Sequence, residues 1–467
     1  MSKNFKFITL ISLVSFLIFT GFGCKGMSGK EVAATEKVTL EFWTVYDDVD
    51  AMQKIIQKYR ETRPYLTINI KQLGYDELYP RLVEALSEDK GPDIISVHAR
   101  NLEKFKSKLA PMPATAPDTI VTQQKNIANQ IETIVTINTI NMPTADQIDR
   151  SFVQTVKKDT IIDGKIYGLP LSLDTMAIFY NKDLLDRSGV AELPKTWEEF
   201  QEAVRKISKF DKETGRIIQS GVALGRYDNI ASAEDILYVL FKQSGVDFIS
   251  DNNQAIFNLK PANLRSNEMT PAMTVMNFYT DFANQNRDTY SWNQEMKNSL
   301  DAFIEGKTAF FFGYSYDNDT VKARAPQLNY GIMPMLQLNT DKPANISNYW
   351  VQTVVGKSKH QGEAWSFIKY LTFSQATEDY LAETKRPTAL RSYVNKQKED
   401  LDLLPFVEQI LISDSWYRGQ DYDVAKRAVG DMINEWLDKP TSNNEPEARS
   451  ADQNILNRGA TKINQTM

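Results

Sequence analysis

The sequence contains almost none of the residues on which many enzymes and metal sites depend. It has one cysteine and two histidines, His98 and His360, in 467 residues. A single thiol excludes a disulfide within the chain and any cysteine-based zinc or iron–sulfur site. The two histidines are too far apart in the sequence to suggest a metal pair, and they leave little material for a Ser/His/Asp triad. This scarcity favours a binding protein over an enzyme, and we expect no cofactor.

An excess of positive charge is also missing. Lys and Arg number 54 against 60 Asp and Glu, which gives a net charge of −6 and a pI of about 5.4. Such a chain has no net positive field to attract phosphate backbones, so nucleic acid is not an expected partner. What is present is 42% hydrophobic and 11% aromatic residues. These proportions allow a sizeable core, and the length allows roughly two to four domains.

The N-terminus has the features of an export signal. Two lysines precede the apolar run Phe7 to Phe19, which has the length of a signal-peptide core. Cys24 follows soon after, and residues 20–23 before it resemble the lipobox of bacterial lipoproteins. We predict a signal peptide over 1–23, lipid attachment at Cys24 and a flexible tether over 24–37. The protein would be exported and anchored to the outer face of the cell membrane, or periplasmic. An uncleaved N-terminal anchor is the alternative.

Hydrophobic patterns after the tether predict alternating strands and helices. Val38 to Val45, Leu66 to Leu73 and Asp93 to His98 have the composition of strands. Helical spacing separates them over Asp48 to Arg63 and Asp76 to Ser87. This order implies right-handed crossovers and a parallel sheet, which is an open α/β lobe.

The rest of the chain is predicted to be richer in helix. Residues 114–151 mix Pro, Thr, Gln and Asn with short apolar runs, and we expect helix with loops there. Thr196 caps a helix whose apolar face carries Trp197, an expected core residue. The segment 231–305 is mostly helical in pattern, and the chain after His360 has the pattern of helices with polar connections.

Eight segments in order resemble the extracellular solute-binding proteins of ABC importers, the family that includes maltose-binding protein. They are VTLEFWTV, IIQKYRETRP, LSEDKGPDIISV, DGKIYGLPLSLDTMAIFYNKDLL, LPKTWEEFQEAVRKI, IEGKTAFFFG, SKHQGEAWSFIKYLT and KRPTALRSYV. The ordered set, from Val38 to Val394, carries the resemblance rather than any one motif. It implies a two-lobe α/β periplasmic-binding-protein fold with hinge crossings and a helical C-terminus. It also implies a solute held in the cleft and presented to the membrane subunits of an ABC permease.

The resemblance predicts where the chain passes between the lobes. The crossings are expected at Pro170 to Asp174, Tyr330 to Met335 and Leu371 to Ser374. The N-lobe would then comprise 38–171 plus 333–370, and the C-lobe 172–332 plus 371–467. Each lobe is therefore expected to be discontinuous in sequence.

Candidate ligand-binding residues lie on loops that follow strands, where clefts gather polar groups and aromatic rings. This rule and the resemblance together select Tyr46, Asp47, Tyr75, His98, Arg100, Asp174, Tyr314, Tyr316, Tyr349, Trp350, Trp416 and Tyr417. Aromatic rings suit the C–H faces of sugars, and polar groups suit their hydroxyls. A sugar or oligosaccharide is therefore the leading prediction. Convergence of Arg226, Arg386 and Arg418 would instead favour a phosphorylated or carboxylated ligand.

Two other functions are compatible with the sequence. A surface receptor or sensor could use the same fold without delivering solute to a permease. An exported glycosidase is the enzyme alternative, because 60 carboxylates always permit a catalytic pair. The run Asp317-Asn318-Asp319 lacks the spacing of a calcium-binding EF-hand loop, so no metal site is predicted.

Overall fold

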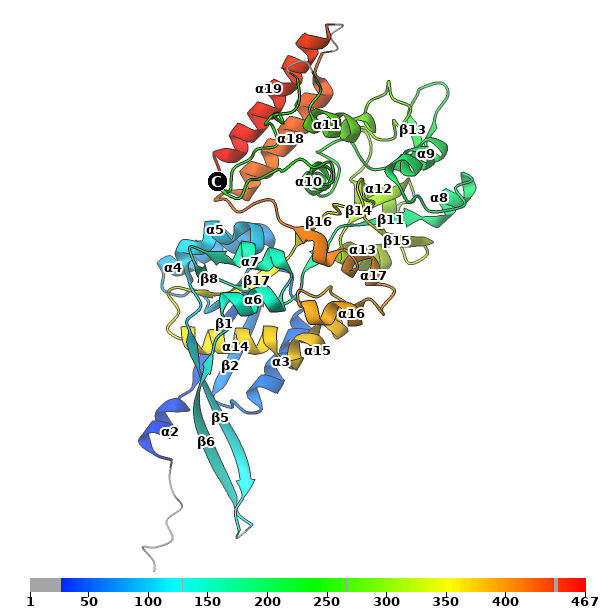
Figure 1. Cartoon of the computed structure of the whole chain (residues 1–467). Helices are drawn as coiled ribbons and strands as arrows, with labels where there is room; N and C mark the ends of the chain where they lie inside the picture. Colours follow the sequence, from blue (N-terminus) through cyan, green and yellow to red (C-terminus); the bar gives the residue numbers. More distant parts are fainter. Residues whose placement is uncertain (1–26, 128, 266–267, 441–443) are drawn as a thin grey trace, which may run out of the picture.

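The computed structural model describes residues 27–127, 129–265, 268–440 and 444–467. The predicted signal peptide and the lipid site at Cys24 lie outside these residues. The described chain forms two α/β lobes, one above the other in Figure 1, with a long two-stranded ribbon projecting from the lower lobe. The predicted two-lobe α/β architecture is therefore confirmed. No helix in the described ranges is both long and apolar enough to cross a membrane.

The lower lobe is built on a six-stranded sheet of order β2-β1-β3-β17-β4, with β9 also paired to β17. Strand β1 runs parallel to β2 and β3, and β17 runs antiparallel to β3. The strands are β1 Val38–Thr44, β2 Leu66–Gln72, β3 Ile94–His98, β4 Leu109–Ala110, β9 Leu169–Pro170 and β17 Trp350–Val355. The helices are α3 Val49–Arg60, α4 Tyr75–Ser87, α5 Leu102–Phe105, α6 Ala145–Ser151, α7 Gln154–Thr160, α14 Gln361–Phe373, α15 Gln375–Thr384 and α16 Val394–Gln397. The first five predicted elements are confirmed to within a residue or two at most ends.

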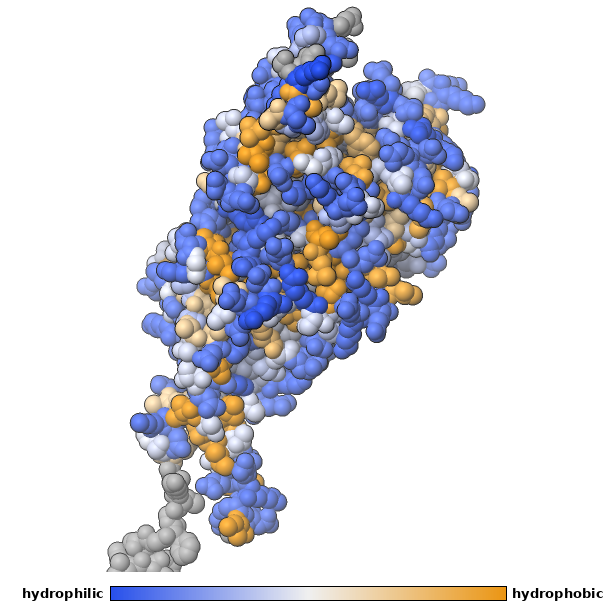
Figure 2. Space-filling view, viewed as in Figure 1, coloured by the Kyte–Doolittle hydropathy of each residue, from blue (hydrophilic) through white to orange (hydrophobic). Residues whose placement is uncertain are grey.

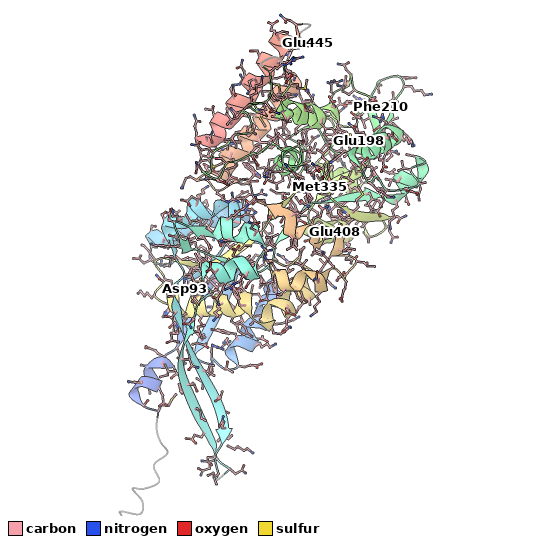
Figure 3. The ribbon with its side chains drawn as sticks, viewed as in Figure 1. Asp93, Glu198, Phe210, Met335, Glu408 and Glu445 are labelled. Atoms are coloured by element: carbon pink, nitrogen blue, oxygen red, sulfur yellow. The ribbon has the colours of Figure 1, made fainter. Side chains whose placement is uncertain are left out.

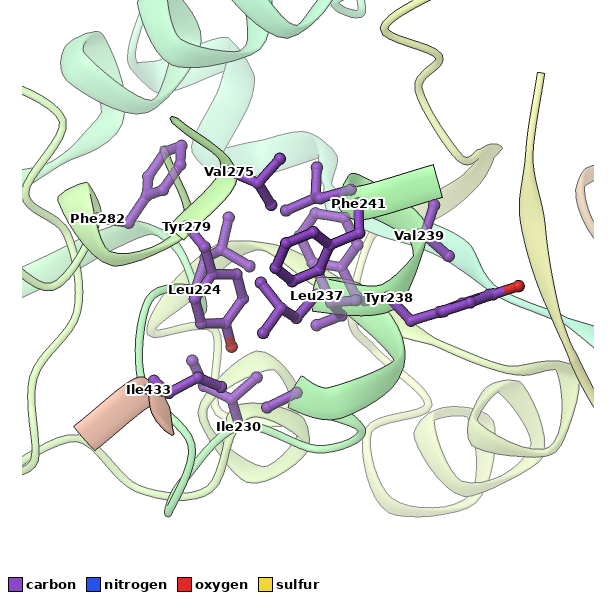
Figure 4. Close-up of a cluster of buried hydrophobic side chains, with 14 of the residues drawn as sticks. Leu224, Ile230, Leu237, Tyr238, Val239, Phe241, Val275, Tyr279, Phe282 and Ile433 are labelled. Carbon is purple, nitrogen blue, oxygen red and sulfur yellow. The ribbon is translucent and has the colours of Figure 1, made fainter. Parts of the chain in front are cut away.

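The upper lobe has a five-stranded mixed sheet of order β12-β13-β14-β11-β15. Its strands are β11 Ala177–Asn181, β12 Lys209–Phe210, β13 Ile217–Val222, β14 Thr308–Gly313 and β15 Tyr330–Pro334. Its helices are α8 Lys182–Arg187, α9 Trp197–Ile207, α10 Ala233–Gln243, α11 Pro271–Asp281, α12 Ser299–Ile304, α13 Ser315–Arg324, α17 Leu404–Val407, α18 Tyr422–Asp438 and α19 Glu445–Asn464. Helix α10 is buried on nearly every side, and Figure 4 shows Leu237 and Phe241 packed with Tyr279 of α11. Trp197 is 1% exposed in this core, as expected.

Three short strands join the lobes at the hinge. Strand β16 (Asn345–Asn348) lies between β10 (Asp174–Thr175) and β18 (Ser413–Asp414). It pairs antiparallel with β10 and parallel with β18. Because each strand comes from a different passage of the chain between the lobes, this small sheet ties all three crossings together.

The packing differs from the predicted domain division at two crossings. Strand β15 belongs to the upper sheet, where it pairs with β11, and Met335 after it is still part of the upper core (Figure 3). Leu371, Tyr380 and Val394 all pack in the lower-lobe core, so the chain does not leave that lobe after Leu371. We therefore propose 38–171 plus 349–397 as the lower lobe in place of 38–171 plus 333–370.

The segment 114–151, predicted as helix with loops, is mostly an antiparallel ribbon. Strands β5 (Thr115–Lys125) and β6 (Ile131–Asn141) pair along their whole length, and only 145–151 is helical. The β-branched residues that alternate through β6 favour an extended chain. Figure 2 shows hydrophobic surface at the end of the ribbon, where Ile127 is fully exposed.

The predicted tether also contains a helix. Helix α2 (Gly29–Ala34) begins at Ser28, whose hydroxyl accepts from the Glu31 N–H at 3.3 Å while the Glu31 carboxylate accepts from the Ser28 N–H at 2.6 Å. This reciprocal capping stabilises the first turn. None of the helix is buried, so part of the predicted flexible segment is ordered without being packed into the core. Two further short strands, β7 Ile161–Ile162 and β8 Lys165–Ile166, form a separate hairpin.

Candidate functional site

A cavity of about 280 Å³ lies between the lobes and against the hinge. We call it the cleft cavity. The lower lobe contributes Tyr46, Tyr75, His98, Arg100, Tyr349, Trp350, Lys385, Arg386 and Pro387. The upper lobe and hinge contribute Ser172, Asp174, Ser232, Glu234, Asp235, Ser315, Tyr316, Asp319, Asn348, Tyr422, Asp423 and Lys426.

Eight of the twelve predicted ligand-binding residues line this cavity. They are Tyr46, Tyr75, His98, Arg100, Asp174, Tyr316, Tyr349 and Trp350. The other four, Asp47, Tyr314, Trp416 and Tyr417, are buried and do not line it. Contact between any of these side chains and a ligand stays a prediction.

Trp350 is the centre of an aromatic wall on the lower lobe. Its ring centroid lies 5.4 Å from Tyr46, 6.0 Å from Tyr75 and 5.4 Å from His98, with the rings tilted by 64°, 89° and 87°. The sheet explains this grouping: Trp350 begins β17 directly opposite His98 at the end of β3, and Tyr46 follows β1. Because these positions share one edge of the sheet, their side chains reach the same space.

Tyr316 provides an aromatic surface on the upper lobe. Its ring is stacked on Tyr314 at a centroid distance of 5.6 Å and an angle of 21°. Tyr316 is 50% exposed and lines the cavity, whereas Tyr314 is fully buried beneath it. The cavity therefore has exposed aromatic rings on both lobes.

A buried ion pair crosses the cleft. The Arg100 Nη2 atom lies 3.0 Å from the Asp235 carboxylate, and both side chains are almost fully buried. Arg100 Nη1 donates to the Tyr422 hydroxyl at 2.6 Å. Burial alone would lower the pKa of Arg100, but Asp235 more than offsets this and raises it well above its ordinary value. Arg100 is thus a permanent cation, and its partner belongs to the opposite lobe.

Two of the predicted residues that do not line the cavity, Tyr314 and Trp416, form hydrogen bonds with Asp235 instead. Asp235 accepts a hydrogen bond from the Tyr314 hydroxyl at 2.6 Å and from the Trp416 indole N–H at 3.1 Å. Tyr314 and Trp416 therefore hold the carboxylate that faces Arg100. We infer a positioning role for them in place of the predicted ligand contact.

The other two residues outside the cavity have structural partners. Asp47 accepts from the Ser96 hydroxyl at 2.6 Å within the lower core. The Tyr417 hydroxyl accepts from the Asp421 N–H at 2.7 Å and donates to the Thr466 carbonyl at 3.1 Å, which fixes the C-terminal end of the chain. Asp47 was selected because it follows the first strand, and Tyr417 because its segment resembles one of the family, but neither signal shows which way a side chain turns.

His98 is a neutral imidazole in this setting. Burial, together with the nearby Arg100 charge, lowers the pKa of His98 to about 4. Its Nδ1 accepts from the Arg100 backbone N–H at 3.3 Å, so the proton is on Nε2, which donates to Asn348 Oδ1 at 2.8 Å. His98 therefore links the lower sheet to the hinge strand β16.

Asp174 makes a similar link between the hinge and the upper lobe. Its carboxylate accepts from the Ser315 N–H at 2.8 Å and the Ser315 hydroxyl at 2.6 Å, and from the Thr175 N–H at 2.8 Å. Burial raises the pKa of Asp174 to about 7 in spite of these hydrogen bonds. Asp174 thus changes its charge near neutral pH at the point where the lobes join.

Sequence reasoning missed the acidic and basic residues of the upper lobe. Glu234 and Asp235 lie in the first turn of α10, and Tyr422 and Lys426 are one turn apart on α18. Lys426 Nζ is 3.1 Å from Glu234 Oε1. The sequence signal for Tyr422 and Lys426 was their spacing of four residues, which places them on the same face of α18. The sequence could not show that the first turns of α10 and α18 meet at the cleft, because that depends on how the chain folds.

The cations of the cavity are mostly neutralised. Of the three arginines considered for an anionic ligand, only Arg386 lines the cavity. Arg226 and Arg418 lie outside it, where they form ion pairs with Asp228 and Asp159. Lys385, Lys426 and Arg100 on the cavity wall each have an acidic partner. The convergence of arginines that would have favoured an anionic ligand is therefore not found among the described residues.

Two buried polar atoms on the cavity wall are without a hydrogen-bond partner within the described structure: Arg100 Nε and Glu234 Oε2. One is a donor from the lower lobe and the other an acceptor from the upper lobe. A hydroxyl both donates and accepts, so it could satisfy either atom once a ligand displaces the side chains that cover it. In the same described ranges, no three His, Cys, Asp or Glu side chains are grouped so as to hold a metal ion.

Comparison with known proteins gives a consistent match. Residues 46–378 match a family described as bacterial extracellular solute-binding protein. The chain is 21% identical to a multiple sugar-binding protein of Streptococcus mutans, over 91% of this chain and 92% of that protein. It is 23% identical to a diacetylchitobiose-binding protein of Streptomyces coelicolor, over 81% of this chain and 80% of that one.

A solved structure shows the same fold. The cyclic α-maltosyl-1,6-maltose-binding protein of Arthrobacter globiformis aligns with a TM-score of 0.68 at 18% identity, covering 91% of this chain and 99% of that one. At this identity the likeness concerns the arrangement of the two lobes and not the ligand.

Proposed function

Because the chain belongs to the family of bacterial extracellular solute-binding proteins, we propose that it captures a small uncharged carbohydrate between its lobes and presents it to an ABC permease. Members of this family are carriers, so the protein is a binding protein and not an enzyme. This argues against the exported glycosidase considered from the sequence. The relatives named above bind sugars, which supports a carbohydrate here.

The observation that carries the proposal is the composition of the cleft cavity. Trp350 and Tyr316 supply aromatic surfaces from opposite lobes, and the unpartnered Arg100 Nε and Glu234 Oε2 supply a donor and an acceptor. This combination fits a pyranose ring with its apolar faces and its rim of hydroxyls. The paired cations favour an uncharged sugar over a phosphorylated or acidic one.

The size of the cavity favours a short ligand. Its volume of about 280 Å³ is close to the lower end of the ~300–1,000 Å³ typical of ligand pockets. We therefore propose a mono- or disaccharide as the preferred ligand. The ion pair Arg100–Asp235 joins the two lobes in this structure, and we propose that ligand binding stabilises this closed arrangement.

Export and anchoring complete the proposal. An extracellular binding protein must be exported, and a lipid at Cys24 would keep it beside its permease. The apolar segment before Cys24 supports this part of the proposal.

A thermal-shift screen with matched sugars tests the function. Neutral mono- and disaccharides should include a stabilising ligand, and at ~100 times its dissociation constant it should add ~2.7 kcal/mol of stability. Its 6-phosphate and its uronic acid should not stabilise the protein at the same concentration. Stabilisation by the anionic forms alone would contradict the proposed ligand class.

A further inference from the structure

A second cavity lies beside the hinge, separate from the cleft cavity. It has a volume of about 520 Å³ and shares no lining residue with the cleft cavity. Its wall combines Lys158 of the lower lobe with residues of the upper lobe and of the hinge. The upper lobe contributes Tyr238, Lys242, Asp247, Phe248, Ile249, Ser250, Asp251, Asn253 and Ile256, and the hinge contributes Asp414, Ser415, Trp416 and Arg418. We call it the hinge cavity. Trp416 lines it and hydrogen-bonds Asp235, which lines the cleft cavity, so these two side chains form a shared wall.

The charges on the wall of the hinge cavity are already neutralised. Each of its three cations has an acidic partner: Lys158–Asp414 at 2.7 Å, Lys242–Asp247 at 3.0 Å and Arg418–Asp159 at 2.7 Å. A charged ligand would have to break one of these pairs. The remaining acid on the wall, Asp251, is exposed to solvent. The wall is therefore suited to an uncharged molecule.

Polar atoms on the same wall lack hydrogen-bond partners within the described structure. Ser415 is 3% exposed, and its hydroxyl has no partner. Asn253 Oδ1 is buried and also unpartnered, while the Nδ2 of the same amide donates to the Arg418 carbonyl at 3.0 Å. That bond fixes the amide and leaves its oxygen as a buried acceptor without a partner in the described structure.

An aromatic side chain adds a third hydrogen-bonding group. Tyr238 lines the hinge cavity, and Figure 4 shows its ring extended away from the aliphatic core cluster with the hydroxyl at its far end. Phe248 and Trp416 also line the cavity, and each is 1% exposed. Three hydroxyl or amide groups beside aromatic rings are the chemistry that binds a polyhydroxylated molecule.

We propose that the hinge cavity is a second ligand site, which binds a small uncharged polyol or monosaccharide independently of the cleft. Its occupant touches Lys158 of the lower lobe and the hinge strand β18 at once, so it contacts parts of the chain on both sides of the hinge. The site goes beyond the proposed transport function and does not depend on it.

Fluorine NMR of the full chain labelled with 5-fluorotryptophan tests the proposal. The chain has seven tryptophans, and the Trp416 and Trp350 signals are assigned by replacing each with Phe. Glycerol, myo-inositol and D-glucose serve as probes, each titrated to 100 mM. At least one probe should shift the Trp416 signal with a saturating curve. The shift should persist in Trp350→Ala, where the cleft is impaired.

Matched variants identify the atoms responsible. Asn253 has a φ of 58°, which glycine accepts, so Asn253→Gly removes the amide without strain and should weaken the probe at least tenfold. Ser415→Ala should weaken it as well. Asn434→Ala is the control, because its Oδ1 is likewise buried and unpartnered but Asn434 lines neither cavity; it should leave the titration unchanged.

Two outcomes would overturn the proposal. Failure of every probe to shift the Trp416 signal would show that the hinge cavity holds water only. A Trp416 shift that disappears in Trp350→Ala would show that the signal reports the cleft alone. Neither outcome would affect the thermal-shift test of the cleft ligand, so the two proposals fail separately.

Discussion

Replacement of Trp350 by alanine should weaken sugar binding without unfolding the protein. Trp350 is half-buried at the start of β17 and lines the cleft cavity. None of its three aromatic neighbours is parallel to the indole. Because these neighbours are tilted, they cannot replace the indole as a flat stacking surface on the lower lobe. A pyranose stacked on Trp350 would therefore lose its apolar contact with that lobe in the variant.

The magnitude follows from the burial of a large side chain. Losing such an apolar contact costs about 1.5–3 kcal/mol. Since ~1.4 kcal/mol is a factor of ten in affinity, the dissociation constant should rise by roughly 10- to 150-fold. Isothermal titration calorimetry with the best neutral sugar measures this change, and circular dichroism checks that the variant is folded.

Trp197→Ala is the matched control. Trp197 is 1% exposed in the upper core and does not line the cleft cavity, so its loss should cost about 3–5 kcal/mol of unfolding free energy. The affinity of the folded fraction should stay nearly unchanged. An affinity that depends on Trp197 and is indifferent to Trp350 would refute the placement of the site.

Three further predictions concern charge, pH and anchoring. Asp235→Ala leaves Arg100 buried and unpaired and should cost about 3–5 kcal/mol in urea unfolding, whereas Glu383→Ala, which removes an exposed ion pair, should cost less than about 1 kcal/mol. The folded pKa of Asp174 is raised to about 7, so the folded state holds a proton that the unfolded state releases, and stability should fall as pH rises from about 4 to 7. Asp174→Asn should remove that part of the slope, up to about 1.4 kcal/mol per pH unit; an unchanged slope would contradict the assignment. Cys24→Ser should release the protein from membranes, and an unchanged membrane fraction with unchanged lipid labelling would favour an uncleaved anchor.

Much of the lower lobe could be predicted because its signals are local. The strand β1 and the helix α3 follow directly from period-two and helical spacing of apolar residues. Residues at strand ends, such as Tyr46 and His98, could be assigned to the cleft for the same reason, since parallel strands end at one edge of the sheet. Local pattern and sheet geometry were sufficient there.

Other features depend on packing that no local pattern contains. Strand β6 has no buried residue and β5 buries only Ala116 and Thr119, so the ribbon lacks the regular alternation of buried and exposed residues that marks a half-buried strand. The ion pair of Asp235 with Arg100 depends on where the first turn of α10 lies relative to the lower lobe, which the sequence alone does not show. Trp416 was assigned to the ligand by resemblance, but its indole N–H is used by Asp235. We propose a later position for the third crossing than the resemblance implied, because α14 and α15 remain against the lower core.

A crystal structure of the chain with the best neutral sugar from the screen tests the central claim most directly. We expect one or two sugar rings in the cleft cavity, between Trp350 of the lower lobe and Tyr316 of the upper lobe. Hydroxyls should reach Arg100 Nε and Glu234 Oε2, two buried atoms of cavity-lining residues that have no hydrogen-bond partner in the described structure. A sugar bound outside the cleft cavity, or held by one lobe alone, would contradict the account.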